Sequence, residues 1–289
     1  MKKLLLIFLL ITGFTCKEHK QNKNSSTLLE SFKYSKGADP IISVHRGGKG
    51  IAGYPENCLE TIKYIHERIP AIYEVDIAQT KDKVLVLMHD NTLERTTTGQ
   101  GKINQYNYTE LLQFNLVDDF GTPTVFQIPR FEDVLNWAKD NDVVLTIDIK
   151  RSVKVKDVID IIQKNNAQDV SIIITYDLKQ AQKAYKLAPE LILSVSARNE
   201  QELDWLIHSS IPIENMVAFT GTKLSSPELY KKVHSYGMKC ILGALGNLDK
   251  RAQARGDHLY QEWISQGIDI IATDRPLAVA ESLNLKKEE

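Results

Sequence analysis

Basic clusters, paired cysteines and long apolar segments are all scarce in this chain of 289 residues. Lys and Arg number 36 against 37 Asp and Glu, so the formal net charge is −1, and the basic residues are spread along the sequence. Proteins that bind nucleic acid usually concentrate positive charge on one face or stripe. The even balance excludes bulk electrostatic attraction of this kind, and we expect no nucleic-acid partner.

The few cysteines show no metal-binding spacing. Cys16 lies near the N-terminus, whereas Cys58 and Cys240 are far apart in the sequence. Without a Cys-x-x-Cys pair, a zinc site built on cysteines is not indicated. We expect Cys58 and Cys240 to be buried thiols rather than a disulfide, although an exported protein could oxidise them if they met.

The longest apolar run, Leu4 to Ile11, follows a basic start at Met1-Lys2-Lys3. It is too short to cross a bilayer as a helix but has the size of a secretory signal. We predict a signal peptide over residues 1–15, then a polar tether with a short cap over residues 16–39. Cys16 resembles the lipid-accepting Cys of a bacterial lipoprotein, which would anchor an exported protein at the cell envelope, in the periplasm or at the outer membrane. Secretion without a lipid and an uncleaved anchor are the alternatives.

From Pro40 onward, short apolar runs alternate with helical segments. This rhythm of about eight β units is typical of a (β/α)8 TIM barrel, which we predict over residues 40–285. The runs that we interpret as strands are Ile41–Val44, Ala71–Ile77, Val84–Met88, Val143–Ile149, Ser171–Thr175, Leu191–Val195, Met216–Phe219, Lys239–Leu242 and Ile268–Ala272.

A segment rich in Thr, Gly, Asn and Gln, about residues 91–128, interrupts the alternation. Such a long excursion is usually a lid or an inserted subdomain, so we predict a small insertion after the second strand. A doubly wound open sheet is the alternative fold. It usually carries a G-x-G-x-x-G fingerprint after its first strand, and the stretch from His45 to Gly50 does not fit that pattern.

Carboxylates stand out at the ends of the predicted strands. Glu74 and Asp76 lie two apart in an apolar run, so a strand places both on one face. Two such charges repel unless a proton or a cation neutralises them. Asp148 and Lys150 repeat the spacing two strands later, and in a barrel these strand ends meet at one mouth. Three carboxylates suit a hard divalent cation such as Mg²⁺ or Ca²⁺.

The other polar residues at these strand ends indicate phosphoryl chemistry. Arg46 and Lys150 could hold phosphate oxygens, and His45 and His89 could act as general acid and base. Asp90 could orient a neighbour or cap a turn. Asp274 and Arg275 are expected to pair with each other near the barrel mouth.

Several motifs in order carry a resemblance to a known family. They are His45-Arg46-Gly47, Pro55-Glu56-Asn57, Glu74-x-Asp76, His89-Asp90, Asp148-x-Lys150 and the stretch from Gly267 to Pro276. Together they resemble the glycerophosphodiester phosphodiesterase family, which has a phospholipase C-like TIM barrel, and the N-terminus resembles its bacterial lipoprotein-type members. The resemblance covers about Ile41 to Pro276.

The resemblance implies hydrolysis of a small-molecule glycerophosphodiester to sn-glycerol 3-phosphate and an alcohol, with one divalent cation. It implies an acid–base pair in His45 and His89, and metal ligands in Glu74, Asp76 and Asp148. It implies substrate contacts from Arg46, Lys150, Glu56 and Asn57.

Two departures from the family pattern bear on specificity. Asp148 stands where the family usually has a Glu, and the stretch from Lys239 to Gly246 replaces a segment that lines the glycerol pocket. Two alternatives therefore stay open. One is a phospholipase C- or D-like or glycerophosphoinositol phosphodiesterase, and the other is a non-catalytic lipoprotein that binds phosphodiesters.

Overall fold

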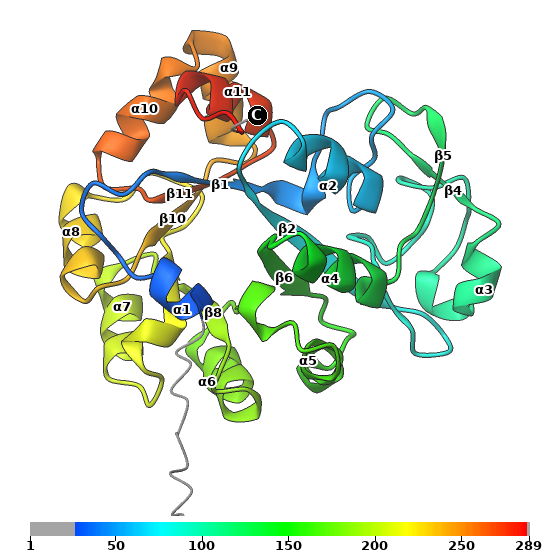
Figure 1. Ribbon diagram of the computed structural model, residues 1–289, viewed down its shortest axis with the longest axis horizontal. Helices are drawn as coiled ribbons and strands as arrows, with labels where there is room; N and C mark the ends of the chain where they lie inside the picture. The colour runs from blue at the N-terminus through cyan, green and yellow to red at the C-terminus, as the bar shows by residue number, and fades with distance from the viewer. Residues whose placement is uncertain (1–26, 288–289) are drawn as a thin grey trace, which may run out of the picture.

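The computed structural model describes residues 27–287, and the predicted signal peptide and Cys16 lie outside them. Within the described residues, eight parallel strands form a closed barrel, because β1 pairs with both β11 and β2. Figure 1 shows these strands surrounded by helices. The predicted (β/α)8 TIM barrel is thus confirmed. Its strands are β1 (Ile41–Val44), β2 (Ile72–Gln79), β6 (Leu145–Ile149), β7 (Ser171–Ile174), β8 (Ile192–Ser196), β9 (Met216–Phe219), β10 (Cys240–Gly243) and β11 (Ile270–Thr273).

The barrel strands read as nearly continuous apolar runs because both of their faces are buried. Helices cover the outside, and three of them begin where the Asp177, Asn199 or Ser226 side chain accepts a backbone N–H three residues later. The outer helices are α2 (Leu59–His66), α4 (Phe131–Asp140), α5 (Val155–Lys164), α6 (Leu178–Leu187), α7 (Glu200–Ile207), α8 (Pro227–Ser235), α9 (Asn247–Arg255), α10 (His258–Ser265) and α11 (Pro276–Ser282). The sequence analysis missed α9.

A short helix, α1 (Thr27–Ser31), closes the N-terminal end of the barrel. Leu28 and Phe32 are buried in one cluster with Ile72, Ile192 and Ile270, the first residues of three barrel strands. Figure 1 shows α1 on the side of the barrel that faces the viewer. The cap expected inside the tether of residues 16–39 is therefore packed against the barrel.

The strand predicted at Val84–Met88 is not part of the barrel, which corrects the sequence analysis. β2 runs on to Gln79, and the chain then turns back so that β3 (Leu85–Leu87) pairs antiparallel with it. The Met88 N–H donates to the Asp76 carbonyl, 2.9 Å away. This turn places His89, the residue after Met88, level with Asp76 and next to the barrel mouth.

The predicted insertion forms a small unit beside the barrel. It contains α3 (Tyr108–Leu111) and an antiparallel pair, β4 (Asn115–Val117) and β5 (Pro123–Gln127), which lie together at the right of Figure 1. Its apolar side chains have a core of their own, in which Val86, Leu111 and Ile128 are buried. The insertion is therefore a folded subdomain that starts from the β2–β3 hairpin.

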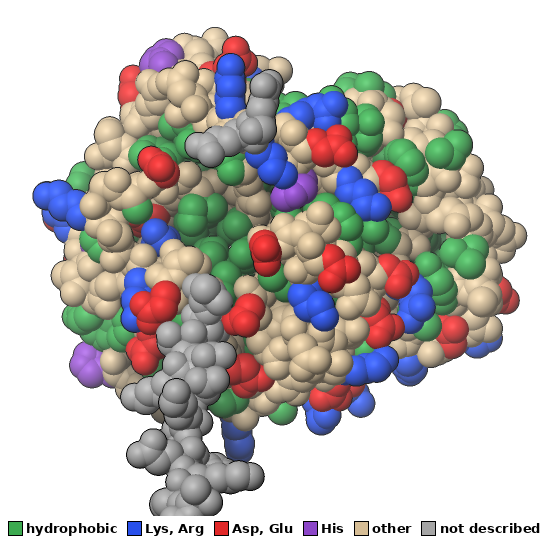
Figure 2. All heavy atoms as spheres, viewed as in Figure 1, with side chains coloured by type: hydrophobic (Ala, Val, Ile, Leu, Met, Phe, Trp, Pro, Cys, Tyr) green, Lys and Arg blue, Asp and Glu red, His purple; other side chains and the backbone are tan. Residues whose placement is uncertain are grey.

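Cys58 and Cys240 are buried and free, as predicted. Burial raises the pKa of the Cys58 thiol to about 12. Within residues 27–287, no helix is long and apolar enough to span a bilayer. Figure 2 shows acidic and basic side chains mixed over the face seen in Figure 1.

Candidate active site

Three carboxylates meet at the carboxyl ends of β2 and β6. Asp76 and Asp148 are direct partners in the parallel register of these strands, and Glu74 precedes Asp76 on the same face. One oxygen from each of the three lies within 4.8 Å of the others. Their exposed fractions are 8% for Glu74, 2% for Asp76 and 9% for Asp148. The structure therefore brings together all three residues that we predicted as metal ligands.

The charges of this cluster are only partly balanced. The Lys150 ammonium lies 2.5 Å from Asp76 Oδ1 and 3.0 Å from Asp148 Oδ2. Burial raises the pKa of Asp76, but the Lys150 charge and the Asn57 hydrogen bond lower it below its ordinary value. Burial and the charge of Asp76 raise the pKa of Glu74 well above its ordinary value. A divalent cation would relieve this repulsion, and an all-oxygen donor set suits a hard cation.

His45 lies just after β1, in the short 3₁₀ turn η1 (His45–Gly47). Its Nδ1 is 2.6 Å from Asp274 Oδ1, and its Nε2 is 3.9 Å from Glu74 Oε2. With Nδ1 facing a carboxylate, the tautomer that donates from Nδ1 leaves the Nε2 lone pair directed toward the carboxylate cluster.

The backbone around His45 is held in an uncommon conformation. Arg46 has φ 55°, in the left-handed region, and its N–H donates to Glu74 Oε2 at 2.7 Å. Gly48 has φ 130°, and a Cβ there would lie 2.5 Å from side chains of α2. Left-handed backbone costs energy in a residue other than Gly. The close approach to α2 and the hydrogen bond to Glu74 hold the loop in place.

His89 is arranged like His45. It follows β3, and its Nδ1 is 2.6 Å from Asp90 Oδ1. Arg95 Nε donates to Asp90 Oδ2 at 2.5 Å. This hydrogen bond lowers the pKa of Asp90 far below its usual range, so that the carboxylate stays charged. Each candidate acid–base histidine therefore has its Nδ1 held by an aspartate, and Asp90 orients its neighbour as we considered from the sequence.

Glu56 and Asn57 support other site residues. Glu56 is buried and accepts hydrogen bonds from Arg46 at 3.0 and 3.1 Å and from Arg95 at 2.7 and 3.0 Å. The Asn57 amide donates to Asp76 Oδ2 at 2.7 Å, and its oxygen accepts the Asp76 N–H at 2.9 Å. Both side chains contact protein groups that border the site, and their contact with substrate stays a prediction.

Arg46 and Lys150 are both close to the carboxylates. The buried Nε of Arg46 makes no hydrogen bond and lies 3.9 Å from Asp76 Oδ2. Burial lowers the pKa of Lys150, but Asp76 and Asp148 raise it above its ordinary value, so that its charge is retained. The two cations that we predicted to hold a phosphate therefore lie on the rim of the carboxylate cluster.

Two residues of the site were missed. Asp274 contacts His45 rather than Arg275, which instead pairs with Asp257 at 2.5 Å, so the pairing that we expected is wrong. The signal for Asp274 was the closure of the barrel: Val44 and Thr273 are register partners on β1 and β11, so the residues that follow them are neighbours. Nothing in the sequence indicated the second residue, Tyr176.

Tyr176 follows β7 and donates its hydroxyl to Asp148 Oδ1 at 2.8 Å, although 56% of the residue is exposed. Burial of the hydroxyl and the nearby charge of Asp148 raise the pKa of Tyr176. Asp148 is thus held from one side by Lys150 and from the other by Tyr176.

The chain is similar to known proteins over most of its length. The Glycerophosphoryl diester phosphodiesterase family model matches residues 45–277. A crystal structure of a glycerophosphoryl diester phosphodiesterase from Parabacteroides distasonis is 33% identical, with a TM-score of 0.85, and the match covers 90% of this chain and 92% of that one.

Curated relatives agree with this match. The glycerophosphodiester phosphodiesterase of Caldanaerobacter subterraneus is 24% identical over 82% of this chain and 94% of its own. The Bacillus subtilis protein YqiK is 29% identical over 52% of this chain, and the match spans 63% of YqiK, just under two thirds of its length. With the family match covering most of the barrel, this chain belongs to the glycerophosphoryl diester phosphodiesterase family.

Proposed function

We propose that the protein hydrolyses glycerophosphodiesters to sn-glycerol 3-phosphate and an alcohol. The observation that carries this proposal is the pair of histidines, each with Nδ1 against an aspartate, beside the three-carboxylate cluster. Hydrolysis of a phosphodiester requires one group that removes a proton from the attacking oxygen and another that protonates the leaving oxygen. His45 and His89 are suited to these two tasks.

Glu74, Asp76 and Asp148 would hold one divalent cation, Mg²⁺ or Ca²⁺, because their oxygens converge within 4.8 Å. When bound, the cation supplies charge stabilisation for the phosphate oxygens. Arg46 and Lys150, on the rim of the cluster, add positive charge where the phosphate would sit.

The proton transfers belong to the histidines. The Nε2 of one histidine accepts the proton of the attacking water while the new P–O bond forms. The Nε2 of the other, protonated beforehand, gives its proton to the alkoxide oxygen as the old P–O bond breaks. Asp274 and Asp90 hold the two rings so that Nε2 is the reacting nitrogen in each.

The test is an assay of the purified full chain with glycerophosphocholine and either Mg²⁺ or Ca²⁺. A coupled glycerol-3-phosphate dehydrogenase reaction measures the product. His45→Ala and His89→Ala should each lower kcat by about 10²–10⁴-fold, whereas His208→Ala, at an exposed position after α7, serves as the matched control. If neither cation supports cleavage, or if His45→Ala behaves as the native protein does, the proposal is wrong.

The same assay separates the alternatives. Intact phosphatidylcholine and glycerophosphoinositol, offered beside glycerophosphocholine, test a phospholipase-like or inositol-specific activity. Binding of the cation without turnover of any diester would indicate a protein that only binds phosphodiesters.

We also propose that the protein is exported and carries a lipid on Cys16, which would place the barrel at the cell envelope. The support is the basic and apolar N-terminal sequence. Mass spectrometry of the mature N-terminus tests it: a diacylated Cys16 is expected, and an unmodified N-terminus at another residue would contradict it.

A further inference from the structure

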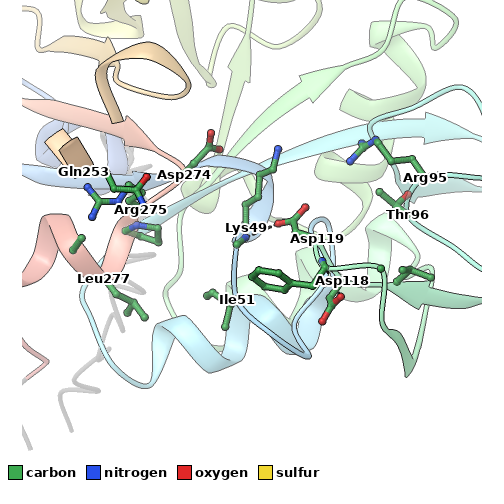
Figure 3. A pocket seen from close by; sticks show the side chains of 16 residues that line it. Lys49, Ile51, Arg95, Thr96, Asp118, Asp119, Gln253, Asp274, Arg275 and Leu277 are labelled. Carbon is green, nitrogen blue, oxygen red and sulfur yellow. Dashed lines mark hydrogen bonds between the residues drawn. The ribbon is translucent and has the colours of Figure 1, made fainter. Parts of the chain in front are cut away.

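A cavity of about 850 Å³ lies beside the candidate active site (Figure 3). Its walls come from the loop after η1, the turn between β4 and β5, and the start of α11. Asp274 and Arg95 both line it. These residues contact His45 and, through Asp90, His89. A group that leaves the phosphate at either histidine would therefore have this cavity next to it.

Two of the charged side chains that line the cavity have few or no partners among the described residues. Most of its charged side chains already have protein partners: Arg95 with Glu56 and Asp90, Arg275 with Asp257, Asp274 with His45, and Asp118 with three backbone N–H groups. Lys49 makes no ion pair or hydrogen bond within residues 27–287. Asp119 accepts one hydrogen bond, from the Gly50 N–H at 2.5 Å.

Lys49 and Asp119 project into the cavity from different walls, as Figure 3 shows. Lys49 lies close enough to Asp274, which contacts His45, for its charge to act on that carboxylate. Burial raises the pKa of Asp274, whereas His45 and the charge of Lys49 lower it, with a net result below the ordinary value. Asp119 is followed by Phe120, which lines the cavity and is 65% exposed. The cavity thus offers a cation at its catalytic end, and a carboxylate beside an aromatic ring on the turn between β4 and β5.

We propose that this cavity binds the leaving group of the substrate and selects an alcohol with an ammonium group, such as choline or ethanolamine. The inference rests on the proposed phosphodiesterase activity. Lys49 contacts the phosphodiester, and Asp119 and Phe120 contact the ammonium group. A carboxylate and the face of an aromatic ring both attract ammonium ions. A neutral alcohol would leave Asp119 without a counter-charge, and an anionic alcohol would be repelled by it.

The hydrogen bond from Gly50 also ties the β4–β5 turn to the loop after η1, so a purely structural role for Asp119 must be separated from ligand binding. Asp119→Asn makes this separation because the amide oxygen can still accept the Gly50 N–H while the charge is lost. Phe120→Leu keeps an apolar side chain but removes the ring. Asp140→Asn, at the exposed end of α4, is the matched control.

The experiment compares kcat/KM of the full chain with Mg²⁺ on glycerophosphocholine and on glycerophosphoglycerol, whose leaving group is neutral. The native protein should prefer glycerophosphocholine. Asp119→Asn should lower the ratio of the two kcat/KM values about fivefold, and Phe120→Leu should lower it about threefold. Lys49→Met should lower kcat/KM for both substrates and leave the ratio as it is, and Asp140→Asn should change nothing.

The outcomes are distinguishable. If the native protein releases glycerol 3-phosphate from both substrates but neither variant changes the ratio, the headgroup site is wrong and the proposed function stands. A native preference for glycerophosphoglycerol would also overturn the headgroup site. If neither substrate is cleaved with Mg²⁺ or with Ca²⁺, the proposed function itself fails.

Discussion

Replacing Asp274 by Asn tests whether this carboxylate orients His45. Asp274 Oδ1 lies 2.6 Å from His45 Nδ1, and the Asp274 backbone N–H donates to Asp249 Oδ2 at 2.7 Å, which fixes the position of the residue. Asn has nearly the same shape as Asp, so the substitution removes the charge without leaving a void. The amide can still accept from Nδ1, or it can rotate and donate to it.

The expected loss of kcat/KM depends on which of these two hydrogen bonds the amide makes. A hydrogen bond to a charged group contributes roughly 1.5–3 kcal/mol and a neutral one about 1 kcal/mol. Losing about 1.4 kcal/mol of orientation in the transition state lowers kcat/KM about tenfold. If the amide donates instead, Nδ1 must accept, so the proton of the neutral His45 ring lies on Nε2. Nε2 then cannot act as a general base, and kcat/KM falls by about 10²–10⁴-fold.

The assay is glycerol 3-phosphate release from glycerophosphocholine at saturating Mg²⁺, with Tm measured in parallel. Asp257→Asn is the matched control, because Asp257 forms a similar ion pair with Arg275 next to the site but does not contact His45. We expect at least a tenfold loss for Asp274→Asn, roughly, and little change for the control. The reasoning is refuted if Asp274→Asn keeps most of the native kcat/KM, or if both variants lose activity equally.

Three further predictions concern the cation site and the loop before α2. Tyr176→Phe removes the hydrogen bond to Asp148, about 1 kcal/mol, so calorimetry should show roughly fivefold weaker Mg²⁺ binding with kcat recovered at saturating cation; equal affinity would argue against this role. Because burial raises the pKa of Glu74, protons compete with the cation. The apparent affinity for Mg²⁺ should therefore fall by up to about tenfold per pH unit below that raised pKa and level off above it. An Mg²⁺ affinity that does not change with pH in the native protein would contradict the assignment of Glu74 as a ligand. Gly48→Ala, whose Cβ would lie 2.5 Å from side chains of α2, should lower the free energy of unfolding by about 2–4 kcal/mol in urea titrations. Gly50→Ala, with nothing within 4 Å of its Cβ, should cost only about 1 kcal/mol, and equal losses would refute the steric argument.

The barrel could be predicted because its strands have a strong local signature. Strands buried on both faces read as nearly continuous apolar runs, and polar residues mark their ends, so β7 and β8 were identified within one residue at each end. β3 was misinterpreted for the same reason. Its residues are buried, Val86 in the core of the insertion and Leu85 and Leu87 in the main hydrophobic cluster, but β3 pairs antiparallel with β2. Burial alone does not reveal whether a strand belongs to the barrel.

The site could be predicted as a set of residues but not as a set of contacts. Glu74 and Asp76 share a face because strand side chains alternate. His45 lies at the barrel mouth because it comes directly after β1. The partners of these side chains depend on which strand ends adjoin. Glu56, for example, is sequestered by two arginines, one of them from the insertion.

The order of residues along the chain was enough to predict four features. These are the carboxylate pair on β2, the two histidines, the alternation of strands and helices, and the family resemblance. Alternation of side chains and burial of strands are local rules that operate at spacings of a few residues. The contacts of Asp274 with His45 and of Tyr176 with Asp148 span 229 and 28 residues. Only the tertiary structure brings these groups within hydrogen-bonding distance: closure of the barrel sets β11 against β1, and lateral pairing sets β7 against β6.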